Sequence, residues 1–159
     1  SMLSSIDRAA RTPVSQKYGL LFLRITTAGL LLWWGLVKGL NLGFGQAVSD
    51  KYYAGTFTAD VPLIVFGWLQ VAAAVSLALG LFRSVVLWLQ LAINLFVAIV
   101  VWQSLIDPFW IWMPAVKPET HNGLFYPSII VLAASWVLIA LRDQDELALD
   151  RRMSGRDGT

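Results

Sequence analysis

The sequence contains no cysteine and a single histidine, His121. The chain therefore has no disulfide, no thiolate metal site and no iron–sulfur cluster of its own. One histidine also excludes a haem held by two histidines of this chain, and the acidic residues show no metal-ligand spacing around it. We expect no metal site and no covalently bound cofactor, so any redox cofactor comes from a partner subunit or is a free molecule such as a quinone.

Charged residues are also scarce. They make up 14% of the chain, whereas hydrophobic residues make up 57%. A soluble domain usually carries about 25% charged residues, so part of the apolar surface of this single domain must face lipid. The formal net charge is only +2, and the basic residues lie toward the ends of the chain. This distribution indicates orientation in a membrane and argues against nucleic-acid binding.

Catalytic motifs are missing as well. The sequence has no nucleophile elbow, phosphate loop, HExxH motif or dinucleotide fingerprint. If the protein takes part in catalysis, we expect it to be at most a membrane subunit of a quinone-linked oxidoreductase.

What the sequence does have is four long apolar runs. They cover about residues 18–37, 61–82, 85–106 and 124–141. At ~1.5 Å per residue each run reaches across a hydrocarbon core of ~30 Å, and in lipid such runs must be helical. The pattern predicts an all-α integral membrane four-helix bundle over residues 18–141. Residues 1–17 form an N-terminal segment, and residues 142–159 form a tail that we expect to be solvated, with partner docking as the alternative.

The placement of lysine and arginine predicts the orientation. Eight basic residues fall on the side of the termini and the 83–84 turn: Arg8, Arg11, Lys17, Arg83, Arg142, Arg151, Arg152 and Arg156. The opposite side has only three: Lys38, Lys51 and Lys117. Cytoplasmic segments carry the excess of basic residues. Both termini are therefore expected in the cytoplasm.

Two charges fall inside the first run. Arg24 and Lys38 are 14 residues apart, which is ~21 Å along a helix and less than the ~30 Å core. Helical side chains lean toward the helix N-terminus, so Arg24 reaches the cytoplasmic surface and is assigned a structural role. Lys38 leans back into the membrane, where an ammonium costs several kcal/mol without a partner or water. We expect Asp107 to pair with Lys38; an interfacial lysine in water is the alternative.

Further polar and aromatic residues are candidates for a ligand site. Asp107, Glu119 and His121 lie on the same side of the membrane as Lys38, next to a set of tryptophans that includes Trp34. These residues have two readings: an interfacial aromatic belt with a capping histidine, or an aromatic-lined pocket where the histidine bonds a quinone carbonyl or relays protons.

The spans themselves also carry polar residues. Gln70 lies in the second run and Gln90 and Asn94 in the third. They suit either interhelical hydrogen bonds or contacts to a quinone. The small residues Ala72 and Ser76 recur four apart before Gly80, and this spacing predicts close helix packing.

Several short motifs, in order, resemble the DoxX (DoxX/DoxD-like) family of bacterial four-helix membrane proteins. The resemblance covers about Leu20 to Arg152. The matching pieces are Leu23-Arg24, Trp34-Gly35-Leu36-Val37-Lys38, Tyr52-Tyr53-Ala54-Gly55, Gly80-Leu81-Phe82-Arg83, Asp107-Pro108-Phe109, His121, Arg142-Asp143-Gln144-Asp145 and Leu149-Asp150-Arg151.

The resemblance implies a multi-pass protein of the bacterial or archaeal cytoplasmic (inner) membrane. It implies a quinone-interacting or anchoring subunit of a membrane oxidoreductase system, with Lys38, Asp107 and His121 as the functional positions. The partners would be membrane lipid, a quinone and a soluble or membrane redox protein, and a homo-oligomer stays open. The alternative is a non-enzymatic membrane scaffold, chaperone or lipid-binding protein.

Overall fold

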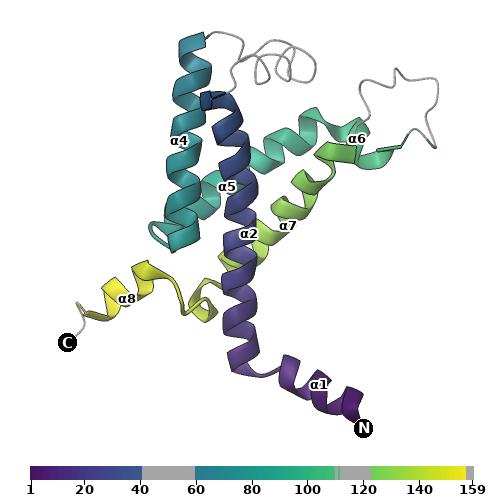
Figure 1. The fold of residues 1–159 in the computed structure, drawn as a ribbon, viewed down its shortest axis with the longest axis vertical. Coiled ribbons are helices and arrows are strands. Elements are labelled where there is room, and N and C mark those ends of the chain that lie inside the picture. Colours follow the sequence, from purple (N-terminus) through teal and green to yellow (C-terminus); the bar gives the residue numbers. More distant parts are fainter. Residues whose placement is uncertain (41–59, 110, 112–122, 157–159) are drawn as a thin grey trace.

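The computed structural model describes residues 1–40, 60–109, 111 and 123–156, and this part of the chain contains helices and no strand. The elements in order are α1 (Met2–Ala10), α2 (Pro13–Leu40), α4 (Asp60–Leu79), α5 (Arg83–Val100), α6 (Trp102–Ile106), η2 (Gly123–Phe125), α7 (Pro127–Ala140), η3 (Arg142–Gln144) and α8 (Leu149–Arg156). Figure 1 shows α2 and α4 side by side, with α5 and α7 crossing behind them. The all-α prediction is confirmed.

In the part of the chain that the structure describes, three helical segments are long and apolar enough to cross a membrane: Pro13–Leu40, Arg83–Val100 and Gly123–Ala140. Within the second expected run, the apolar part of α4 is shorter, Ile64–Leu79. Large apolar side chains on these helices are exposed, including Phe22 (71%), Ile99 (64%) and Trp136 (72%). Apolar surface of this extent is stable in lipid and unfavourable in water. The protein is therefore built for a membrane.

The turn between α4 and α5 differs from the sequence prediction, which had only residues 83–84 between the helices. Gly80 ends α4 with a left-handed backbone, φ +77°. Its N–H donates to the Leu77 carbonyl, and the N–H of Leu81 donates to the Ser76 carbonyl, which is the Schellman arrangement. The turn therefore comprises residues 80–82, and Arg83 is the first residue of α5. The third apolar run is also interrupted, at Val101 between α5 and α6.

Glycines allow α2 and α4 to pack closely against each other. A Cβ placed on Gly67 would lie 2.8 Å from the Gly35 carbonyl oxygen and 2.8 Å from the Gly39 nitrogen. These two helices make the most extensive contact in the described fold. The packing stripe expected at Ala72 is wrong: Ala72 is exposed, whereas Ala74 is buried.

A core forms where the helices meet at their lower ends in Figure 1. Its buried residues come from α2, α4, α5 and α7: Leu20, Ala28, Leu77, Val86, Leu87 and Leu138. The buried side of α2 also includes Arg24, Thr27 and Leu31. Two short helices, α1 and α8, lie in the lower half of the view, on opposite sides of α2 (Figure 1).

Candidate functional site

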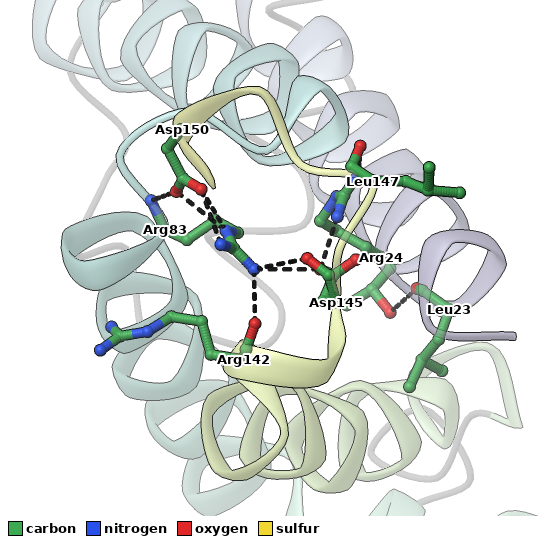
Figure 2. Close-up of polar contacts among 8 residues, drawn as sticks. Leu23, Arg24, Arg83, Arg142, Asp145, Leu147 and Asp150 are labelled. Atoms are coloured by element: carbon green, nitrogen blue, oxygen red, sulfur yellow. Dashed lines mark hydrogen bonds and ion pairs between the residues drawn. The ribbon is translucent and has the colours of Figure 1, made fainter. Parts of the chain in front are cut away.

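Two polar clusters lie along α2, one around Arg24 in its N-terminal half and one around Lys38 near its C-terminal end. The lower one, the arginine–aspartate cluster, consists of Arg24, Arg83, Asp145 and Asp150 (Figure 2). Arg24 and Asp145 are each 1% exposed, and Nη1 of Arg24 lies 2.5 Å from Oδ2 of Asp145. Nη2 of Arg24 also donates to the Leu147 carbonyl, at 3.3 Å. The expectation that Arg24 reaches the cytoplasmic surface is wrong: its guanidinium is buried against Asp145, a partner that the sequence did not identify.

Arg83 joins the two aspartates. Its Nη2 lies 2.6 Å from Oδ1 of Asp150, and its Nη1 lies 3.5 Å from Oδ2 of Asp145. Nη1 also donates to the carbonyls of Arg142 (2.9 Å) and Asp145 (3.2 Å). Two cations and two anions balance, and buried charges are tolerated only when paired and hydrogen-bonded in this way.

The same cluster fixes the C-terminal segment to the 80–82 turn. The N–H of Asp150 donates to the Gly80 carbonyl, at 3.0 Å. Ala148 is fully buried, and a Cβ on Gly80 would lie only 2.5 Å from the Ala148 Cβ. The expectation of a solvated tail is wrong at Asp145, Ala148 and Asp150, which are buried or half-buried, because Arg24 and Arg83 need anionic partners once they are buried. Beyond Asp150, Arg151, Arg152 and Met153 are exposed.

Asp150 lies outside the membrane-spanning helices. Partial burial by itself raises the pKa of this carboxyl, but the hydrogen bonds and positive charge of Arg83 oppose it. The net effect is a pKa below the ordinary aspartate value. The carboxylate is therefore charged at neutral pH, as the ion pair requires.

At the upper end of α2 in Figure 1 lies the lysine cluster: Lys38, Gln70, Trp34 and Phe66. Nζ of Lys38 donates to Oε1 of Gln70 at 2.9 Å, and Nε2 of Gln70 donates to the Leu31 carbonyl at 3.0 Å. Gln70 is 6% exposed. It holds the ammonium of α2 from the facing helix α4, across the contact that the glycines make possible.

Aromatic rings surround this ammonium. Nζ of Lys38 lies 5.3 Å from the ring centre of Phe66 and 6.0 Å from that of Trp34, within cation–π range. Trp34 in turn stacks on Phe125 of η2, with ring centres 6.0 Å apart and planes 17° apart. The cluster thus combines a cation, an amide and flat apolar faces.

The expected ion pair between Lys38 and Asp107 is wrong. Lys38 uses Gln70, because its side chain leans toward the N-terminus of α2 and meets α4 there. Asp107 is fully buried at the end of α6, and its Oδ1 accepts from the N–H of Ile111 at 2.6 Å. Its carboxylate thus organises the chain after α6.

The amides of α5 serve helix packing. Nε2 of Gln90 donates to Oγ of Ser135 in α7 at 2.9 Å, and Nδ2 of Asn94 donates to the Gln90 carbonyl at 2.8 Å. The Gln90 contact agrees with the interhelical hydrogen-bond reading, whereas the Asn94 bond lies within α5. Asn94 makes no hydrogen bond to the lysine cluster.

The remaining candidates, Glu119 and His121, lie outside the described residues, so their place relative to Lys38 stays a prediction. Within the described ranges, no group of acidic residues and histidines is arranged to hold a metal ion.

Sequence reasoning missed two features. Phe66 was not singled out, although it faces Lys38. The pairing of Asp145 and Asp150 with buried arginines was also missed. The sequence signal for it was the group of acidic residues that follows the last apolar run, on the same side of the membrane as Arg24 and Arg83.

Comparison with known proteins gave no match to a family model, a curated protein or a solved structure.

Proposed function

We propose that the protein is a four-span, DoxX-like protein of the cytoplasmic membrane that serves as a quinone-interacting subunit of a membrane oxidoreductase system. The fourth span in this proposal is α4, whose apolar part packs along α2. The basic residues of residues 1–17 and 142–156 favour cytoplasmic termini. Consistent with this, α1 and α8 both lie in the lower half of the molecule in Figure 1.

The spatial arrangement of the resemblance motifs supports the family part of the proposal. Four motifs from three distant regions of the sequence contribute to one cluster: Leu23-Arg24, the 80–83 turn, the 142–145 segment and Leu149-Asp150. Because these motifs pack into one cluster, each needs the others, which explains why such short motifs would occur together in a fixed order.

The single observation that carries the quinone reading is the lysine cluster. A lysine ammonium has three N–H donors, and one of those of Lys38 bonds Gln70. The other two are suited to the carbonyl oxygen of a quinone, whose flat ring fits against the Trp34 and Phe66 faces. A water-poor site strengthens such a hydrogen bond. Because the chain has no cysteine and one histidine, the electrons would come from a partner protein.

The test uses the purified protein with a short-chain ubiquinone and a short-chain menaquinone. We expect the quinone to raise the melting temperature and to quench tryptophan fluorescence. Lys38→Met should abolish both effects. Lys17→Met, at the opposite end of α2, is the matched control and should leave them intact. Wild-type protein that shows neither effect, or a Lys38→Met variant that binds equally well, would contradict the proposal.

A second candidate is a non-enzymatic scaffold, and the docked tail favours it. Arg24 and Arg83 fix the segment before α8, and α8 then presents Arg151, Arg152 and Met153 to solvent. This reading predicts that a partner copurifies with the wild type and is lost on Arg152→Glu. It also predicts no response to quinone, which separates it from the first candidate.

A further inference from the structure

Helix α1 exposes an apolar side that nothing in the described chain covers. Met2, Leu3 and Ile6 are 78%, 77% and 58% exposed, and no residue of α1 is buried. At 100° per residue these three side chains fall within about 100° of one another. Single exposed apolar residues are ordinary, but three on one side of a nine-residue helix form a patch that water does not stabilise.

The other side of α1 is polar and basic. It carries Ser4, Asp7 and Arg8, and Arg11, the residue after the helix, forms an exposed ion pair with Asp7 at 3.0 Å. Lys17 follows in the first turns of α2. With three basic side chains and one acidic side chain, this segment carries a net positive charge. An apolar side opposite a basic side is the pattern of helices that lie in a membrane interface.

The connection to α2 places α1 at such an interface. α2 has 28 residues, which is ~42 Å of helix and exceeds a hydrocarbon core of ~30 Å. Its first turns therefore extend toward the headgroups. Only residues 11–12 separate α1 from α2, and Figure 1 shows α1 leaving the lower end of α2 across the axis of that helix. A helix set across a membrane-spanning helix runs along the membrane plane.

We infer that α1 is a docking element for anionic phospholipid. Met2, Leu3 and Ile6 enter the boundary between headgroups and acyl chains, while Arg8, Arg11 and Lys17 contact lipid phosphates. Positive side chains opposite the apolar face select a negatively charged leaflet over a zwitterionic one. This binding surface is separate from the lysine cluster and does not depend on quinone binding.

The absence of cysteine makes a direct test possible. Single cysteines at Ile6→Cys and Ser4→Cys carry an environment-sensitive fluorophore on the full-length protein in nanodiscs. The two positions lie ~160° apart on the helix, so Ser4→Cys is the matched control. With phosphatidylglycerol present, the label at position 6 should emit at shorter wavelength and be quenched by a nitroxide on the upper acyl chain. The label at position 4 should be quenched several-fold more strongly by aqueous iodide.

Charge variants test the lipid class. The label at position 6 should be less protected from iodide in pure phosphatidylcholine than in phosphatidylglycerol. In phosphatidylglycerol, this protection from iodide should decrease when salt is added. Arg8→Gln should reduce the difference between the two lipids, and Asp7→Asn should increase it. Because α1 contributes nothing to the core, these variants should melt at the wild-type temperature and keep any quinone response.

Three results would overturn the inference. Equal iodide access at positions 4 and 6 in phosphatidylglycerol would show that α1 is not in the interface. Position 6 shielded from both quenchers would show that protein, including a second copy of this chain, covers it. Identical behaviour in the two lipids would remove the anionic headgroup as the ligand.

Discussion

Arg24 of α2 and Asp145, 121 residues later in the chain, form an ion pair in which both side chains are almost completely buried. Nε of Arg24 and Oδ1 of Asp145 have no hydrogen-bond partner among the described residues. Each buried charge is therefore stabilised largely by the opposite charge of its partner. The pair ties the C-terminal segment to the first membrane helix, so disruption of either residue should release the tail.

We predict that Arg24→Met and Asp145→Asn each lower the free energy of unfolding by about 3–5 kcal/mol, because each leaves an unpaired polar or charged group buried. The double variant should lose much less than the sum of the two. Unfolding by SDS titration measures all three. Asp143→Asn, an exposed acid two residues away, should have little effect, and additive losses would contradict a direct pairing.

Gly80→Ala should loosen the docked tail. An alanine has to adopt φ +77°, which costs roughly 1–2 kcal/mol, and its Cβ would meet Ala148 at 2.5 Å. We expect a lower melting temperature and faster proteolysis after residue 145. Gly29→Ala is the matched control, since nothing lies within 4 Å of its Cβ position. It should stabilise the helix by up to ~1 kcal/mol.

Gly67→Ala should separate α2 from α4. Its Cβ would lie 2.7 Å from the Lys38 Cβ and close to the backbone of two residues of α2. Overpacking of this kind costs about 1–3 kcal/mol. The variant should also lose the hydrogen bond between Lys38 and Gln70, and with it the quinone response. An unchanged response would show that the close approach of the two helices is not needed for binding.

The Arg83–Asp150 pair predicts a pH dependence. The pKa of Asp150 is lowered in the folded protein, so the ionised carboxylate stabilises the docked tail. This contribution is complete above the ordinary aspartate pKa of ~3.9 and is lost as the pH falls through the lower folded-state value. Asp150→Asn should therefore melt below the wild type at neutral pH, and the difference should shrink below about pH 4. Asp143→Asn should show no such convergence.

The sequence by itself determined the helical class and the apolar surface of the protein. These features depend on local composition and on the period of the helix, which act over a few residues. The same rules gave Arg24 a structural role but placed it at the surface, whereas it is buried against Asp145. They did not locate the end of α4, because the left-handed backbone of Gly80 decides it.

Only the tertiary structure decided the partner of each charge. The sequence favoured Asp107 for Lys38 because both lie at the same end of their helices, but the approach of α2 and α4 at Gly35, Gly39 and Gly67 brings Gln70 to the ammonium instead. Likewise, Asp145 meets Arg24 because the chain turns back under the helices after α7. Helix periodicity fixes which face a side chain occupies, but the packing of distant segments fixes what that face meets.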